Sequence, residues 1–311
     1  MALTLAEAAL LSENDLQRGV IETFVQSSPV LDRLPLMPIE GNAYAYNEEA
    51  VLPGVAFRSV NEAYVESTGT VNQKTETLAI LGGDADVDRF IVQTRGNLND
   101  QRAVQTSMKV KAAAYKYQDT FFNGDVAVDT KSFDGLKKRL IGSQVLVAAT
   151  NGIGPVAAGH GFFDALDELI AAVAGGADAL YANAAVISKI WSSARRLGGA
   201  EFMNEELTGK RVRTYNGIPL LDPGATAAGV TILPQTETEG TAAGTVSSIY
   251  AVKFGQDEGD QAVTGLTNGG VQVYDLGEID AKPAYRTRIE FYCGLAVFGK
   301  GAARLTGVLN A

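Results

Sequence analysis

The sequence has 311 residues, with 26 Lys and Arg against 36 Asp and Glu, so its formal net charge is −10 and its pI about 4.8. Nonspecific affinity for nucleic acid comes mainly from Lys and Arg that displace counterions, so this balance argues against a large DNA-binding surface. A hydrophobic fraction of 46% with 20% charged residues is typical of a folded soluble protein. No apolar run reaches the roughly 18 residues of a membrane span, and no secretion signal is recognised, so cytoplasmic synthesis is expected.

The residues that usually carry catalysis or bind metals are scarce. His160 and Cys293 are the single His and the single Cys, which leaves no cluster with zinc-site spacing and no imidazole paired with a nucleophile. The glycines between Gly152 and Gly159 fit neither a dinucleotide-binding nor a P-loop pattern. The acidic run Asp84–Asp88 lacks the order of a calcium loop, and a solvated strand face or intersubunit ion pairs remain open for it. We predict no catalytic, cofactor-binding or metal-binding residue, and no enzyme.

The chain begins with a mixed arm over residues 1–37. Leu16, Val20 and Phe24 repeat at helical spacing until Ser27-Ser28-Pro29 interrupts the pattern. Residues 38–90 then favour extended structure, with one strand near Tyr44 and a returning strand from Thr75 to Leu81. The long, weakly apolar segment between them predicts an outward-reaching hairpin that needs a neighbour to lie on.

A long amphipathic helix follows. Asn99 and Asp100 are candidate N-caps, and Asn123-Gly124 predicts a left-handed stop. The apolar residues of one stripe, which we expect to form the buried core face, are Val104, Met108, Ala112, Tyr115 and Phe122. The residues expected on the other faces are Gln101, Gln105, Lys109, Lys116 and Asp119.

The second half mixes helices and strands without regular alternation, which indicates an α+β fold. One helix with Phe163, Leu166, Ile170 and Val173 should end at Gly175-Gly176. After a short buried strand, Ala179–Tyr181, Asn183 should cap a helix that carries Ile187, Ile190, Trp191, Ala194 and Leu197 and ends at Gly198-Gly199. Further strands are expected at Ile218–Leu221, Val230–Leu233, Ile249–Phe254, Val271–Leu276 and Tyr285–Phe298.

Four segments in this order carry a family resemblance: L-P-G-V-A-F-R-S-V-N-E (Leu52–Glu62), F-F-N-G-D (Phe121–Asp125), A-D-A-L-Y-A-N (Ala177–Asn183) and N-G-I-P-L-L-D (Asn216–Asp222). With the order of arm, hairpin, long helix, central α/β region and closing strands, the whole chain resembles the major capsid proteins of tailed phages with the Hong Kong 97 fold. None of these segments is a catalytic motif, so the strength of the resemblance lies in their joint order.

The resemblance implies a domain division. Residues 1–37 would be the N-terminal arm and residues 38–90 the extended hairpin loop. Residues 91–145 and 245–293 would form a peripheral domain around the long spine helix, and residues 146–244 and 294–311 an axial domain at the capsomer centre. The loop residues expected to contact a neighbouring subunit are Leu52, Phe57, Arg58, Asn61, Glu62, Tyr64 and Glu66.

The same resemblance implies a function. The chain would assemble into hexamers and pentamers of an icosahedral virion shell that encloses double-stranded DNA without sequence-specific binding. Its short arm replaces the charged scaffolding segment of some relatives, so we expect separate scaffolding and portal proteins, and a decoration protein stays open. The basic tracts Lys137–Arg139, Arg195-Arg196 and Lys210–Arg213 should pair with acidic residues of neighbouring subunits.

Some relatives crosslink a hairpin Lys to an Asn of a neighbour. Lys74 is the hairpin's candidate, but the expected partner strand reads Arg286-Thr287-Arg288-Ile289, so we expect a noncovalent shell. The alternative is an encapsulin, a nanocompartment shell of the same fold around an enzyme. An enzyme of another class ranks last, because no acid, base and nucleophile come together in the sequence.

Overall fold

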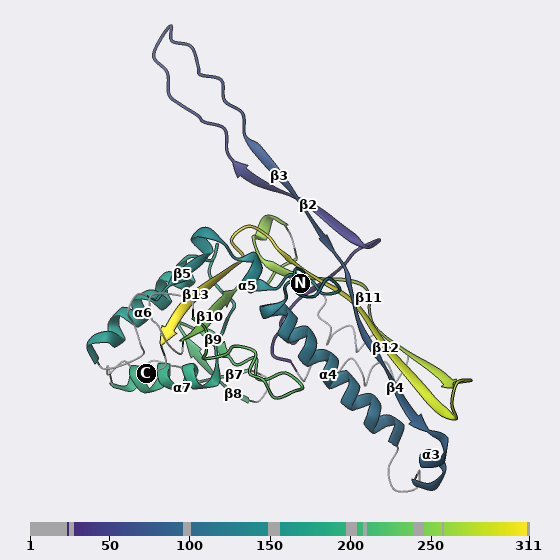
Figure 1. The fold of residues 1–311 in the computed structure, drawn as a ribbon. Helices are drawn as coiled ribbons and strands as arrows, with labels where there is room; N and C mark the ends of the chain where they lie inside the picture. The colour runs from purple at the N-terminus through teal and green to yellow at the C-terminus, as the bar shows by residue number, and fades with distance from the viewer. Residues whose placement is uncertain are drawn as a thin grey trace.

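The structure, a computed structural model, describes residues 24, 28–95, 101–148, 156–196, 204–207, 210–238, 246–256 and 258–309. Its elements form a wedge-shaped body, made of two sheets with three long helices, and a two-stranded hairpin that projects far from that body (Figure 1). Most of the predicted arm helix, the candidate caps Asn99 and Asp100, and Gly198-Gly199 lie outside the described residues.

A four-stranded sheet with the order β1-β11-β12-β4 forms one half of the body. Its strands are β1 (Leu36–Pro38), β4 (Ala79–Asp88), β11 (Val263–Glu278) and β12 (Ala284–Val297). The end of the arm enters this sheet, because β1 pairs in parallel with β11. Helix α3 (Arg89–Arg95) follows β4 at the far end, and the long helix α4 (Gln101–Asn123) packs along β4 and β12.

Helix α4 exists as predicted, but the predicted buried face is wrong for most of its length. Val104 and Met108 are 42% and 60% exposed, and Tyr115 is half-buried, whereas Phe122 is fully buried. The residues that α4 turns into the core are Val110, Ala114, Tyr117, Phe121 and Phe122.

The hydrophobic periodicity of the sequence did not predict the buried inner face of α4, because polar residues interrupt the apolar stripe on that face. Gln118 is 1% exposed and is satisfied inside the protein, since its amide donates to the Pro223 carbonyl and accepts from the Ser28 hydroxyl. Thr106 is buried on the same side. Helix α4 therefore carries two apolar stripes, and the more continuous one is not the one that the subunit buries.

The stop after α4 also differs from the prediction. Gly124 does not have the positive φ of a left-handed cap. Instead it permits a close approach, because a Cβ at this position would lie 2.3 Å from the Phe133 carbonyl oxygen and 2.6 Å from that of Thr120. The Gly135 N–H donates to the Gly124 carbonyl at 2.9 Å, so the segment after α4 folds back against the end of the helix.

The other half of the body is a seven-stranded sheet with the order β5-β13-β10-β6-β9-β8-β7. Its strands are β5 (Val145–Val147), β6 (Ala179–Tyr181), β7 (Asn204–Leu207), β8 (Lys210–Tyr215), β9 (Ile218–Leu221), β10 (Val246–Val252) and β13 (Ala302–Leu309). Helices α6 (Val156–Ala171) and α7 (Ala184–Arg196) pack on one face, through a core that includes Phe162, Leu166, Ile190, Ile249 and Leu305.

The opposite face of this sheet joins the two halves. Phe122 of α4 lies 5.4 Å from the Tyr181 ring of β6 and 5.3 Å from the Tyr250 ring of β10, measured between ring centroids. Strand β10 is an inner strand of the seven-stranded sheet, between β13 and β6, although the predicted division at residue 245 assigned it to the other domain. Strand β12 likewise runs unbroken through the predicted boundary at residue 293.

Several local predictions are confirmed. Strands β6 and β9 have the predicted bounds, Gly175 and Gly176 have positive φ after α6, and the Ala185 N–H donates to the Asn183 side chain at 2.9 Å, as expected of an N-cap. The strand predicted at Val230–Leu233 is wrong, because there only Thr231 forms an isolated bridge, with Ala225. Within the described residues no helix is both long and apolar enough to cross a membrane.

Candidate assembly interface

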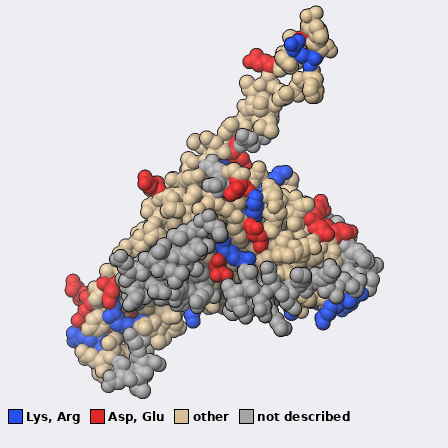
Figure 2. Space-filling model, turned by 180° about the vertical axis from the view of Figure 1, so that it is seen from behind, with Lys and Arg blue, Asp and Glu red and all other residues tan. Residues whose placement is uncertain are grey.

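The hairpin pairs β2 (Ala43–Val51) with β3 (Thr70–Thr77) in antiparallel register, from Ala43 opposite Thr77 to Val51 opposite Thr70. Every residue from Val51 to Thr75 is exposed. Figure 2 shows the ribbon standing clear of the body with a mostly uncharged surface. Pairing between β2 and β3 ends at Val51 and Thr70, and beyond it the Ser67 hydroxyl donates to the Gly54 carbonyl at 2.9 Å, so the segment forms a long ribbon without a core of its own.

All seven residues predicted to contact a neighbour lie on this exposed ribbon. Phe57 is 107% exposed, and the other members of the set, also exposed, are Leu52, Arg58, Asn61, Glu62, Tyr64 and Glu66. Val55, Val60 and Val65 are 88–96% exposed and extend the apolar surface, although the prediction did not include them.

Four of the predicted residues come together at the tip of the ribbon. Asn61 adopts a positive φ of 65°, the Glu62 carboxylate accepts from the Ser59 N–H at 3.0 Å, and the Arg58 guanidinium lies 5.1 Å from the centre of the Tyr64 ring. Leu52 and Glu66 lie further down the two sides of the ribbon. The tip is therefore a locally organised turn that presents apolar side chains outward.

The root of the hairpin is anchored by an aromatic cluster. Tyr46 is 4% exposed, its ring lies 4.9 Å from that of Phe298 in edge-on geometry, and its hydroxyl donates to the Val297 carbonyl at 3.2 Å. Burial and then the nearby Glu76 carboxylate raise the pKa of Tyr46 well above its ordinary value, so this phenol stays protonated and keeps donating. Ile39 and Leu266 complete the cluster.

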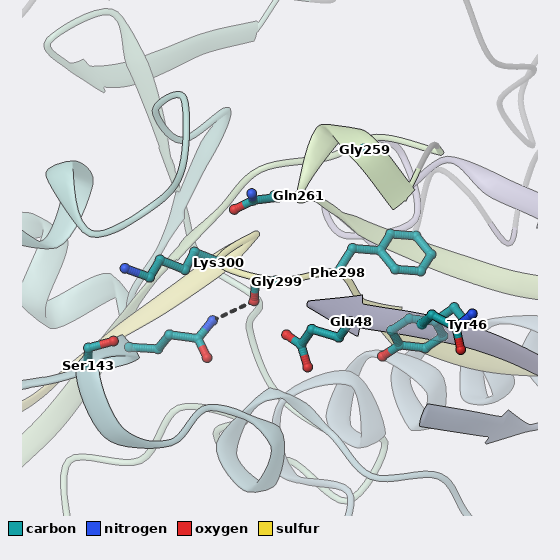
Figure 3. Close-up of a pocket in the computed structure, with 10 residues that line it drawn as sticks. Tyr46, Glu48, Ser143, Gly259, Gln261, Phe298, Gly299 and Lys300 are labelled. Atoms are coloured by element: carbon teal, nitrogen blue, oxygen red, sulfur yellow. Dashed lines mark hydrogen bonds between the residues drawn. The ribbon is translucent and has the colours of Figure 1, made fainter. Parts of the chain in front are cut away.

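A cavity of about 640 Å³ lies beside this root (Figure 3). Its lining residues come from β2, from the turn η1 (Gly142–Gln144), from η2 (Glu258–Asp260) with the residue that follows it, and from the β12–β13 turn. They include Tyr46, Glu48, Ser143, Gln144, Phe298 and Lys300. Gln144 donates to the carbonyl oxygens of Gly299 and Ala302 at 3.0 Å each. These groups brace the β12–β13 turn, and their arrangement fits a polar hollow at a joint better than a reaction centre.

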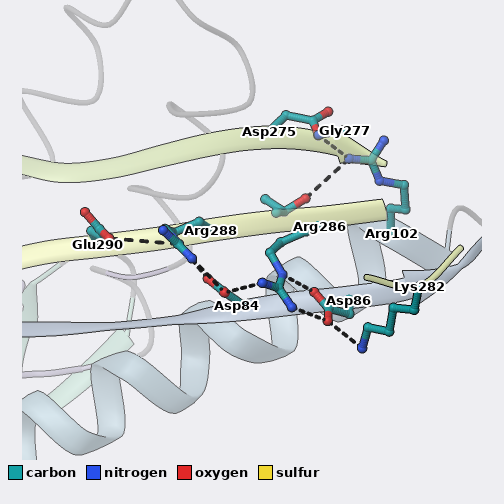
Figure 4. Close-up of polar contacts among 10 residues, drawn as sticks. Asp84, Asp86, Arg102, Asp275, Gly277, Lys282, Arg286, Arg288 and Glu290 are labelled. Atoms are coloured by element: carbon teal, nitrogen blue, oxygen red, sulfur yellow. Dashed lines mark hydrogen bonds and ion pairs between the residues drawn. The ribbon is translucent and has the colours of Figure 1, made fainter. Parts of the chain in front are cut away.

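The alternating acidic run on β4 faces arginines on β12. Asp86 makes a two-pronged contact with Arg286 at 2.7 Å for both pairs of atoms, and Asp84 makes one with Arg288 at 2.8 and 3.0 Å (Figure 4). Lys282 adds a contact to Asp86 at 2.7 Å. These pairs lie within one subunit and follow the strand register, so the suggestion of ion pairs between subunits is wrong for Asp84 and Asp86.

These Asp–Arg pairs form a ladder between β4 and β12 that lowers the pKa of both carboxyls. Hydrogen bonds from Arg288 hold the pKa of Asp84 below its ordinary value of 3.8. Those from Arg286 and then Lys282 hold the pKa of Asp86 well below the same value. Both carboxyls therefore stay ionised in the folded protein, and together they fasten β4 to β12.

The basic tract Lys137–Arg139 also finds its partners inside the subunit, contrary to the prediction. It forms the short helix α5 (Leu136–Arg139). Lys137 lies 3.5 Å from Glu237, Lys138 lies 3.2 Å from Asp125, and Arg139 pairs with Glu76. Sequence reasoning missed Glu76 as the partner of Arg139, since ion pairs between distant segments leave no local pattern.

The remaining candidates for chemistry have structural surroundings. Burial raises the pKa of Cys293 to about 12, which keeps the thiol protonated and unreactive. His160 belongs to α6, but its side chain lies outside the described part of the chain, as do Gly152–Gly154. Among the residues that the structure describes, no three His, Cys, Asp or Glu side chains gather as metal ligands.

Solved shell proteins share this architecture over nearly the whole chain. The holo-SrpI encapsulin complex from Synechococcus elongatus PCC 7942 matches with 20% identity over 91% of this chain and 88% of that chain, at a TM-score of 0.67. The capsid of the native GTA particle matches with 14% identity over 91% and 90%, at 0.64. The protein of Mycobacterium phage Bobi matches with 14% identity over 98% of both chains, at 0.58.

These likenesses define the class: the chain has the Hong Kong 97 fold. No curated protein matches it. Residues 12–161, from the arm through the hairpin and the long helix to the start of α6, match the model of the family described as Major capsid protein GP7. Residues 12–161 are thus similar to that capsid protein family, and the fold of the chain is that of the solved shell proteins.

Proposed function

We propose that this chain assembles into hexamers and pentamers that close an icosahedral shell around the double-stranded DNA of a tailed phage. In this role it is a structural protein and not an enzyme. The four-stranded sheet with α4 serves as the peripheral domain, and the seven-stranded sheet, which includes β10, serves as the axial domain. The β2–β3 hairpin reaches a neighbouring subunit of the same capsomer.

The exposed apolar ribbon is the observation that carries this proposal. Phe57, Val55 and Val60 are each at least 90% exposed, on a segment that contributes nothing to the subunit core. Large contiguous apolar surfaces on soluble proteins mark contact sites for other molecules. A permanent shell needs such surfaces, because obligate interfaces bury on the order of 2,000 Å² or more.

The negative net charge of the chain is consistent with a shell that encloses DNA without binding it tightly. A net charge of −10 favours weak contact with packed DNA, so the DNA is held by confinement and not by sequence-specific binding. Separate scaffolding and portal proteins guide assembly in the host bacterial cytoplasm, and a decoration protein is a further candidate partner. Lys74 is ion-paired with Glu48 at 2.6 Å, which fits a shell without covalent crosslinks.

Electron microscopy of the expressed protein tests the proposal. Closed shells or five- and six-membered rings are expected in the purified material. Protein that remains monomeric at the highest attainable concentration, with and without coexpressed scaffolding protein, contradicts it.

The second candidate is an encapsulin, favoured by the TM-score of 0.67 with the holo-SrpI encapsulin complex. The match to a major capsid protein family favours the phage shell. Particles purified from the native source separate the two candidates by content. A capsid is expected to hold double-stranded DNA, whereas a nanocompartment is expected to hold one enzyme, visible as a second band in constant ratio to the shell protein.

A further inference from the structure

Helix α5 is a junction between three parts of the molecule. Its three consecutive cations each reach a different segment: Lys137 reaches Glu237 before β10, Lys138 reaches Asp125 after α4, and Arg139 reaches Glu76 on β3. The first segment belongs to the half of the body with the seven-stranded sheet, the second follows the long helix, and the third is the root of the hairpin.

The contact between Arg139 and Glu76 is the most constrained of the three. It is two-pronged, with both guanidinium NH groups donating to the two carboxylate oxygens and one of these distances at 2.6 Å. Arg139 Nε donates to the Asp134 carbonyl at 2.6 Å, which fixes the guanidinium plane. The side chains of Arg139 and Glu76 are 15% and 13% exposed. Those of Lys138 and Asp125 are 51% and 31% exposed.

Glu76 lies at the last point where β3 meets the body. From Thr75 outward to Val51 every residue is exposed, so the direction of the ribbon depends on the contacts at its root. Glu76 and Ala63, near the tip, are thirteen positions apart in the sequence, which is roughly 43 Å of extended strand at about 3.3 Å per residue. Over that length, a rotation of about 10° at the root moves the tip by about 8 Å.

The root cluster alone does not define the angle as tightly. Tyr46 and Phe298 make an edge-on ring contact of weak directionality, and the Tyr46 hydroxyl adds a single hydrogen bond, to the Val297 carbonyl at 3.2 Å. The cavity beside them leaves space on one side of the joint. A planar guanidinium that engages a carboxylate with two parallel bonds restricts orientation as well as distance.

We propose that Arg139 is a positioning residue that sets the angle between the hairpin and the body through Glu76, and thereby the curvature of the shell. The effect on curvature rests on the proposed shell function, whereas the effect on the angle is a property of the single subunit. Arg139 acts on Glu76 and not on the neighbouring subunit itself.

The angle is measured in unassembled, full-length protein by distances between two spin labels. One label is placed on the ribbon at Ala63→Cys and the other on the body at Thr130→Cys, with the buried Cys293 changed to Ala. The wild-type pair should give one narrow distance distribution. Arg139→Ala should broaden it by several ångström, and Arg139→Lys, which keeps the charge but loses the fork, should give an intermediate width.

Two controls separate positioning from general stability. Lys138→Ala removes the neighbouring cation of α5 and should leave the distribution narrow. The exchange of Arg139→Glu with Glu76→Arg restores a two-pronged pair and should narrow the distribution again. A distribution for Arg139→Ala as narrow as wild type, or one that the exchange leaves broad, overturns the proposal; loss of thermal stability alone changes neither result.

The consequence for the shell is read from particle diameters in the same variants. Arg139→Ala is expected to give particles of mixed diameter or open sheets, and the exchange to restore one diameter. Uniform wild-type particles from Arg139→Ala refute the link to curvature. If the unaltered protein forms no particles, the shell function itself fails, while the label distances still decide whether Arg139 sets the angle.

Discussion

The β2–β3 hairpin and the four-stranded sheet beside it use apolar residues in opposite ways. In the sheet, Val271, Ile289 and Phe291 are at most 2% exposed and pack against α4. On the hairpin, Phe57 and Val55 are almost fully exposed, with no described residue of the chain packed over them. Since burial of apolar surface is the main favourable term in folding and in association, the sheet stabilises the subunit, and under the proposed function the hairpin stabilises the assembly.

Helix α4 repeats this division within one element. Its inner stripe, with Tyr117 and Phe121, is buried in the subunit, and its outer stripe begins with the exposed Val104 and Met108. Substitutions of apolar residues that are buried in the subunit should therefore change the stability of the subunit. Substitutions of the exposed apolar residues should change the yield of particles instead.

The largest effect, on the yield of closed particles, is expected from charges placed on the apolar ribbon. Phe57→Asp combined with Val60→Asp should abolish closed particles at the wild-type concentration, because charged groups would have to be buried in an interface, while the melting temperature of the subunit stays unchanged. Particle yield by electron microscopy and thermal melting of the subunit provide the two measurements. Thr68→Asp, on the same exposed ribbon, is the matched control and should still assemble.

A large effect on the subunit alone is expected from the inner side of α4. Phe122 contacts Phe121, Tyr181 and Tyr250, so Phe122→Ala should cost about 3–5 kcal/mol of unfolding free energy. Met108→Ala, on the outer stripe, should stay within about 0.5 kcal/mol. Denaturant unfolding of both variants, under conditions that prevent assembly, tests this order. An equal loss for Met108→Ala shows that the outer stripe is core.

A moderate, pH-dependent effect is expected from the ladder between β4 and β12. Because the pKa values of Asp84 and Asp86 are lowered from 3.8 in the folded protein, their stabilisation is complete above that value and disappears as pH falls through the lowered values. The double variant Asp84→Asn with Asp86→Asn should therefore unfold at lower denaturant concentration than wild type from pH 7 to about 5, and this difference should shrink below pH 3.8.

Denaturation midpoints of unassembled protein at several pH values provide that measurement. The exposed Asp280→Asn is the control and should match wild type throughout. A difference between the double variant and wild type that grows as the pH falls is incompatible with this account of the ladder.

The smallest effect, no change in the SDS gel pattern of the particles, is expected from substituting Lys74. Lys74 pairs with Glu48 on the neighbouring strand. The expected partner strand, β12, carries Arg286, Thr287 and Arg288 where a crosslink to the hairpin lysine would need an Asn. Boiling particles in SDS should therefore release a single monomer band, as from Lys74→Gln particles. A ladder of SDS-resistant oligomers that disappears in Lys74→Gln would establish a covalent bond at this lysine.

Much of the fold could be predicted from local patterns. Residue type fixes β6, β9, the Asn183 cap and the double-glycine end of α6, because caps and turns depend on a few neighbouring residues. The length and polarity of the segment around Leu52–Thr70 were sufficient to predict the hairpin.

The errors come from long-range contacts. The outer stripe of α4 has the cleaner periodicity, and only the contacts of Gln118 with Ser28 and Pro223 explain why a polar residue lies on the inner face. The place of β10 in the seven-stranded sheet depends on pairing with β13 and β6, far away in sequence. The pair Arg139–Glu76 joins residues 63 positions apart, a distance at which residue spacing carries no information.

The central claim is that the hairpin builds the shell and not the subunit, and its removal tests this most directly. Val51 pairs with Thr70, so residues 52–69 can be replaced by an Asn-Gly turn that closes the shortened strands. Sedimentation velocity should show closed particles for the wild type and, at the same concentration, only slowly sedimenting subunits with the wild-type melting temperature for the deletion variant. Closed particles from the deletion variant, or a subunit that no longer folds, would contradict the claim.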